Sequence, residues 1–187
     1  MSVREFTKRW WEAQLSHDQG GMVKWLVRLR ATEHFAALRF QNALDRWAFP
    51  DAEKTLFSGI MGDEYRHSRM VTTLLRARDI PFPEELVIGR ERYWEQIWHH
   101  VTDYRLACAS LMFGETLAIT RFEVIAEHPD TPEDVRALIA LIIPDERRHI
   151  STLSAIAGKD GRDAMRGHHR EGMKAIGVIA DDDGNDD

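Results

Sequence analysis

Cysteine, basic charge and long apolar runs are all scarce in this chain of 187 residues. It contains one cysteine, Cys108. This excludes an internal disulfide framework, a zinc site made only of cysteines, and a rubredoxin-type iron centre. The formal net charge is −6, so no basic surface indicates nucleic acid or anionic lipid as a partner. No run of about 18 apolar residues occurs, so we expect no membrane-spanning helix.

The N-terminal segment also lacks the apolar core of a secretory signal, because Arg4, Glu5 and Lys8 interrupt its aromatic residues. A single cysteine suits a reducing compartment, so we expect a cytoplasmic protein. The hydrophobic fraction of 43% and the charged fraction of 30% are ordinary for a globular chain. We expect one helical domain over residues 1–180 and a disordered acidic tail over 181–187.

Strict alternation of polar and apolar residues is missing as well, and the hydrophobic periodicity is helical throughout. The expected fold is therefore all-α, a ferritin-like four-helix bundle with short flanking helices. The four long helices are predicted over about 22–47, 51–78, 90–127 and 132–157, and the flanking helices over 3–17 and 162–179.

Helix-breaking residues define the ends of these segments. Pro50 and Pro129 end the first and third long helices, and Gly158 ends the fourth. Thr131 is expected to cap the N-terminus of the fourth helix, and Pro144 to bend it by removing a backbone hydrogen bond. The pairs 22–47 with 51–78 and 90–127 with 132–157 then become two antiparallel hairpins.

Two near-copies of one motif occur, Asp63-Glu64-Tyr65-Arg66-His67 and Asp145-Glu146-Arg147-Arg148-His149. Each contains Glu-x-x-His, and on an α-helix residues three apart lie on the same face. One copy in a charged helical protein more often marks a solvated surface than a metal site. The second copy, in a second predicted hairpin, favours a shared site.

The spacing of two further acids strengthens this interpretation. Glu33 precedes Glu64 by 31 residues, and Glu115 precedes Glu146 by 31 residues. The midpoint of each pair lies beside a proline turn, so in an antiparallel hairpin both members lie at the same height. At about 15 residues from the turn, that height is about 23 Å along the helix. Four glutamates and two histidines are thus expected in one layer.

The neighbours of these acids are apolar. Leu29 and Ala37 lie four residues before and after Glu33, on the same face of the predicted helix. Leu111 and Ile119 lie four residues before and after Glu115. An acid in an apolar stripe is costly unless it is paired or binds a metal. Solvation at the edge of the stripe explains any one acid, but not all of them at matching heights. The predicted metal ligands are Glu33, Glu64, His67, Glu115, Glu146 and His149.

The donor set favours iron. Oxygen-rich ligands with one imidazole per metal suit iron or manganese better than zinc, which prefers tetrahedral sites rich in nitrogen and sulfur. Glu64 and Glu146 are expected to bridge two ions, with Glu33 and Glu115 as terminal ligands. Four carboxylates neutralise two divalent ions. Two iron ions are therefore predicted, and a manganese–iron pair stays open because it uses the same ligands.

This arrangement resembles the ferritin-like di-iron carboxylate proteins, in which two helices give a Glu each and two give a Glu-x-x-His. The resemblance covers about residues 22–158. The doubled Asp-Glu-x-Arg-His also resembles the motifs of bacterial multicomponent monooxygenases. That resemblance implies that Asp63 and Asp145 orient ligand histidines, with Arg66 and Arg148 completing the network. Solvation of both arginines on the helix surface is the open alternative.

The compact chain is also similar to aldehyde-deformylating oxygenases and to tRNA hydroxylases of the ferritin-like group, although its acidic charge disfavours a tRNA substrate. Storage ferritins lack the last histidine, and rubrerythrins carry a glutamate where this chain has Ala118. These resemblances imply a non-haem di-iron oxidoreductase that activates O₂ to oxidise a small hydrophobic substrate. Electrons would come from a separate donor, since no flavin or iron–sulfur motif occurs; a homodimer stays open. The alternatives are an iron-handling or peroxide-scavenging protein, or a purely structural bundle.

Overall fold

The computed structural model describes residues 1–16, 20–87, 89 and 91–179, and within these ranges all regular structure is helical. The elements are α1 (Val3–Ser16), α2 (Gly20–Arg46), α3 (Asp51–Ala77), α4 (Arg92–Ile97), the 3₁₀-helix η1 (Trp98–His100), α5 (Tyr104–Glu127) and α6 (Glu133–Ala175). The prediction of an all-helical chain is confirmed. The acidic tail predicted over 181–187 lies outside the described residues. None of the described helices has the length and hydropathy needed to cross a membrane.

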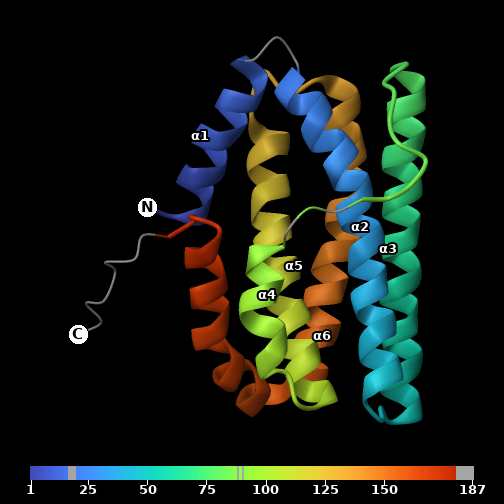
Figure 1. Ribbon diagram of the computed structural model, residues 1–187, viewed down its shortest axis with the longest axis vertical. Coiled ribbons are helices and arrows are strands. Elements are labelled where there is room, and N and C mark those ends of the chain that lie inside the picture. The colour runs from blue at the N-terminus through green and yellow to red at the C-terminus, as the bar shows by residue number, and fades with distance from the viewer. Residues whose placement is uncertain (17–19, 88, 90, 180–187) are drawn as a thin grey trace.

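The long helices pair as consecutive neighbours (Figure 1). α2 packs along α3 and α5 along α6, and contacts between α3 and α6 join the two hairpins. The short helix α4 lies against α6, whereas α1 packs on α5 and α2. The connection from α3 to α4 crosses in front of α2 (Figure 1). The turn between α2 and α3 lies at the opposite end of the molecule from the turn between α5 and α6 (Figure 1).

The prediction of one long helix over 90–127 is wrong in one respect, because the helix is interrupted before α5 begins at Tyr104. Asp103 caps α5 with an extended backbone, and its Oδ1 accepts hydrogen bonds from the amides of Arg105 and Leu106 at 2.8 and 2.9 Å. An aspartate at this position satisfies amides that a continuous helix would bond internally. The aromatic residues Tyr93, Trp94 and Trp98 therefore lie on the separate elements α4 and η1.

The predicted details of α6 are partly corrected. Thr131 is not the cap: its hydroxyl donates to the Ile125 carbonyl at 2.6 Å and accepts from the Trp11 indole at 2.7 Å, while Pro132 holds the cap position. The backbone stays helical at Pro144. Gly158, at φ 67°, is where helical angles fail, as predicted, and the chain then turns back alongside α4 (Figure 1).

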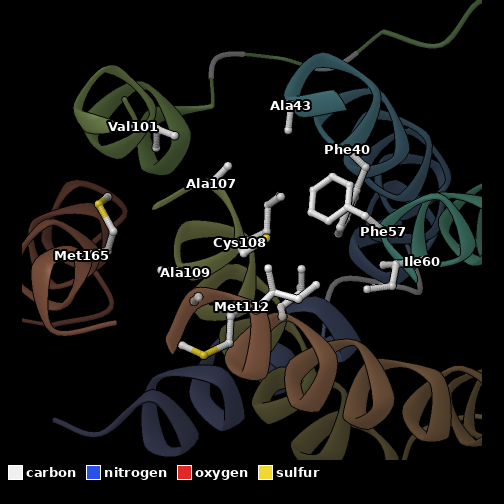
Figure 2. Packing of buried hydrophobic residues seen from close by; sticks show 14 of the residues in the cluster. Phe40, Ala43, Phe57, Ile60, Val101, Ala107, Cys108, Ala109, Met112 and Met165 are labelled. Carbon is white, nitrogen blue, oxygen red and sulfur yellow. The ribbon is translucent and has the colours of Figure 1, made fainter. Parts of the chain in front are cut away.

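Two buried apolar clusters fill the interior. The α4-side cluster contains residues of α4 together with Phe40, Phe57 and Leu153, and Figure 2 shows its packing around Cys108. The α1-side cluster contains Trp11 of α1 and residues of the four long helices, including Leu26, Leu75, Phe122 and Ile139. Their burial supplies most of the free energy that holds the helices together.

Candidate metal centre

The six predicted ligands lie in one polar layer between the two apolar clusters. On α2, Glu33 lies between Leu29 of the α1-side cluster and Phe40 of the α4-side cluster. The same order, cluster, ligand, cluster, recurs along α3, α5 and α6. All six side chains are buried, with at most 8% of their surface exposed: Glu33, Glu64, His67, Glu115, Glu146 and His149. Four buried acids between apolar walls are costly unless a cation or protons compensate them.

The layer contains two overlapping groups of donor atoms, and within each group the atoms lie within 4.8 Å of one another. The first group adds Glu33 and His67 to a shared pair, and the second adds Glu115 and His149 to the same pair. The shared residues are Glu64 and Glu146, the glutamates of the two Glu-x-x-His motifs. Two carboxylates common to two groups are the geometry that bridging ligands require.

Both histidines turn the same nitrogen toward the carboxylates. His67 Nδ1 lies 3.3 Å from Glu146 Oε1 and 3.5 Å from Glu33 Oε2. His149 Nδ1 lies 3.1 Å from Glu64 Oε1 and 3.5 Å from Glu146 Oε2. Each imidazole thus faces an acid of the opposite hairpin, Glu146 for His67 and Glu64 for His149, so the layer closes only when both hairpins are packed together.

These donor atoms are buried without hydrogen-bond partners among the described residues. The atoms are Nδ1 of His67 and His149, Oε1 of Glu64 and Oε2 of Glu146. They approach one another closely but lack the alignment that a hydrogen bond requires. Leaving a buried polar atom unpaired costs about 1–3 kcal/mol, and more for a charged group. Four such atoms aimed at one another fit a site that binds cations.

The opposite nitrogens of the histidines contact aspartates in a crossed pattern. His67 Nε2 lies 3.3 Å from Asp145, which belongs to the other motif, and His149 Nε2 lies 3.3 Å from Asp63. A proton on Nε2 donated to the aspartate leaves the Nδ1 lone pair free for a cation. The aspartates predicted to orient the histidines do contact them, and the structure adds that each serves the histidine of the opposite hairpin.

Arg66 and Arg148 join the two aspartates. Arg66 donates to Asp63 at 2.9 Å and also to Asp145, and Arg148 contacts Asp63 at 2.6 Å and Asp145 at 2.7 Å. Burial raises the pKa of Asp145, but Arg66, His67 and Arg148 outweigh burial and lower it to about 2. The aspartates are therefore anionic. The arginines stay partly exposed, at 40% and 56%, yet they belong to the network.

The protons of the layer are distributed unevenly. Burial raises the pKa of Glu64 and Glu115 well above the usual range, and repulsion from the Glu146 carboxylate adds to the shift. Burial raises the pKa of Glu33 too. For His67, burial acts downward, but the facing carboxylates outweigh it and raise the pKa to about 10. Without a cation the layer therefore holds protons, and a metal has to displace them.

Sequence reasoning missed the residues on the Glu115 side. The charge of Glu115 acts on Arg39 of α2 and on Tyr93 of α4. Burial lowers the pKa of Arg39, and the Glu115 charge opposes this shift. Burial raises the pKa of Tyr93, and the Glu115 charge raises it further. Trp94 packs on Gly114, next to Glu115. In the sequence, Arg39 looks like any surface arginine, and only the absence of a side chain at Gly114 hints at a close neighbour.

No family model, curated protein or solved structure matches this chain. The chemical character of the centre therefore follows from its donor atoms. Each group offers three carboxylates and one imidazole. These buried groups could hold a metal ion, and oxygen donors with one imidazole suit iron or manganese.

Proposed function

We propose that this chain is a ferritin-like four-helix bundle that binds two iron ions and activates O₂ to oxidise a small hydrophobic organic substrate. The observation that carries the proposal is the pair of donor groups that share Glu64 and Glu146. A site for one ion needs one group, and a solvated acidic surface needs none. The burial of both groups between apolar clusters adds support.

In this proposal Glu64 and Glu146 would hold both ions, because only these two residues belong to both groups. Glu33 with His67 would complete one set of ligands, and Glu115 with His149 would complete the other. The charge of four carboxylates offsets the mutual repulsion of two divalent cations. A manganese–iron pair would use the same ligands.

Two ferrous ions, when bound, supply electrons for the reduction of O₂ and act as a template beside the substrate. The protein's own groups hold the protons and the geometry. Asp145 and Asp63 hold a proton on Nε2 of His67 and His149, which would leave Nδ1 free to bind an ion. The apolar clusters on both sides exclude water, which limits side reactions. Because the chain carries no flavin or iron–sulfur motif, a separate donor has to return the electrons.

Anaerobic titration with ferrous iron tests the centre. We expect about two iron ions per chain that resist removal by a chelator, and O₂ consumption that rises when a hydrophobic substrate is added. Fewer than about two retained ions would contradict the paired site. Deposition of many ferric ions per chain, with no effect of any organic compound on O₂ uptake, would favour iron handling instead.

Glu146→Ala is the sharpest variant, because it removes a carboxylate from both groups. We expect loss of the paired site, with less than about two ions per chain. Glu123→Ala provides the matched control, since Glu123 is a partly exposed glutamate of α5 that pairs with Arg4 and Arg147 away from the layer. Unchanged two-iron stoichiometry in Glu146→Ala would contradict the assignment.

A further inference from the structure

A surface groove of about 640 Å³ runs between α2 and residues 91–98, which are called the α4 segment below. This volume is typical of small-molecule sites. Phe35, Leu38 and Arg39 line it from α2. Trp94 and Trp98 line it from the opposite side. Most of this lining is aromatic or aliphatic carbon, which favours an organic molecule over a hydrated ion.

Arg39 is the cation of this groove. Its side chain is 12% exposed, and its guanidinium lies 4.5 Å above the Trp94 ring centre. A guanidinium carries five N–H donors. Among the described residues, one hydrogen bond is recorded for it, from Nη2 to Glu91. A carboxylate in the groove can therefore compete with Glu91 for this guanidinium.

Two residues of the groove lining, Arg39 and Trp94, lie close to the layer of predicted ligands. Burial lowers the pKa of Arg39, and the charges of Glu91, Glu115 and Glu64 oppose that shift, so these acids are within electrostatic range of the guanidinium. Trp94 rests on the α5 backbone at Gly114, where an added Cβ would lie 2.7 Å from the indole. The lining of the groove therefore contacts α5 at the residue next to Glu115.

We propose that the groove binds the organic substrate, and that this substrate is an amphiphilic monocarboxylate whose carboxylate pairs with Arg39 in place of Glu91. Its hydrocarbon part lies against Trp94, Trp98 and Phe35. The proposal rests on the proposed function, because it names the substrate class of the same centre.

Charge explains the choice of ligand. Glu91 demonstrates that a carboxylate fits the Arg39 fork, and Arg–carboxylate pairs are among the strongest recognition contacts. Glu91, which lies in the lining, disfavours a polyanion by repulsion. A neutral hydrocarbon would leave the buried guanidinium without a new partner. One carboxylate attached to an apolar body satisfies both parts of the groove.

A second buried arginine of α2, Arg30, provides a control that distinguishes a role in ligand binding from a role in stability. Arg30 is also buried, but its fork is filled by neutral acceptors: Nη1 donates to the Pro83 carbonyl at 2.6 Å and Nη2 to the Glu84 carbonyl at 3.2 Å. Its Nε donates to Thr72 at 3.2 Å. Arg30 thus fastens the α3–α4 connection to α2 and lies outside the groove lining. Its replacement should lower stability without changing carboxylate binding.

Calorimetric titration of the full-length chain with octanoate tests the proposal, first loaded anaerobically with ferrous iron and then without iron. Quenching of tryptophan fluorescence locates the ligand, since two tryptophans line the groove. We expect saturable octanoate binding in both forms. Octanol and inorganic phosphate should bind at least about tenfold more weakly, because each lacks one half of the ligand.

Three variants make the test decisive. Arg39→Gln should weaken octanoate binding about ten- to hundredfold, and Glu91→Gln should strengthen it, because the internal competitor loses its charge. Arg30→Gln should bind octanoate like the unaltered chain. Equal affinity in Arg39→Gln, equal affinity for octanol, or no gain in Glu91→Gln would each overturn the proposal. Glu91→Gln remains informative even where Arg39→Gln fails to fold.

The outcome for the groove is distinguishable from the outcome for the centre. A chain that retains about two iron ions but ignores octanoate contradicts the carboxylate site and leaves the di-iron proposal standing. A chain that binds octanoate through Arg39 without retaining paired iron contradicts the centre instead. Iron stoichiometry and octanoate affinity are measured on the same preparation.

Discussion

The two halves of the candidate centre have the same kinds of donor residue but different neighbours beyond the layer. The Glu33 half (Glu33 and His67) and the Glu115 half (Glu115 and His149) each add one carboxylate and one imidazole to the shared pair. Outside the layer, the Glu115 half lies near Arg39 and the α4 segment. The likeness fits the proposed pair of ions, and the difference gives the proposed substrate one side from which to approach.

The largest effect is expected from removing one half at a time. Glu33→Ala and Glu115→Ala should each lower the iron content from about two ions to about one per chain, because either acid belongs to a single donor group. Anaerobic ferrous titration followed by metal analysis measures the content. Retention of about two ions in either variant would contradict the assignment of that glutamate as a terminal ligand.

The next effect is on pH dependence. The facing carboxylates outweigh burial and raise the pKa of His67 to about 10, and they raise the pKa of His149 as well. A raised pKa means that the metal-free imidazole holds its proton at neutral pH, so metal binding releases it. Iron affinity should therefore fall as pH falls, about tenfold per pH unit for each displaced proton.

Chelator competition at several pH values between about 6 and 8 measures this dependence, and proton release in weak buffer gives an independent count. His67→Gln removes a group whose pKa is raised to about 10 and should therefore flatten the pH profile. An affinity that does not change with pH would show that the layer holds no displaceable proton.

A smaller effect is expected from the crossed aspartates. Asp145→Asn acts on His67, and Asp63→Asn acts on His149, because each aspartate contacts the histidine of the other motif. Loss of such an orienting partner weakens metal affinity about 10- to 100-fold. The two effects should not add in the double variant, since Arg66 and Arg148 contact both aspartates. Strict additivity would contradict a shared network.

The smallest effect compares two helix glycines beside the ligands. At Gly114 an added Cβ would lie 2.7 Å from the Trp94 indole, so Gly114→Ala should cost about 1–3 kcal/mol of folding free energy. At Gly62 the position is open, so Gly62→Ala should stabilise α3 by about 0.5–1 kcal/mol. Urea unfolding followed by fluorescence measures both. Equal effects of the two substitutions would show that Trp94 does not press on the Glu115 half.

Much of the helical architecture was predictable because its boundaries are chemically explicit. Pro50 has no amide hydrogen to continue a helix, and Gly158 adopts the positive φ that its lack of a Cβ permits. The break between η1 and α5 was not predictable in the same way. Residues 101–103 contain no proline or glycine, and Asp103 is as acceptable on an exposed helix face as at a cap. Packing of the whole chain decides between them.

The gathering of the six ligand side chains followed from spacing alone, because residues three apart share a helix face and acids equidistant from a turn share a height. Which aspartate meets which histidine did not follow. Each helical residue rotates the side chain by about 100°, so the crossed pairs depend on how the two hairpins are turned toward each other. Burial of Arg39 likewise depends on the α4 segment that covers it.

The crossed pairs also govern the order in which the centre can be assembled during synthesis. His67 leaves the ribosome 78 residues before Asp145, and Asp63 leaves it 86 residues before His149. At about 5–20 residues per second, the first hairpin waits several seconds for its partners. During that interval its acids and imidazole are a half-built site open to any cation. The correct ligand geometry becomes available only once α6 has been made.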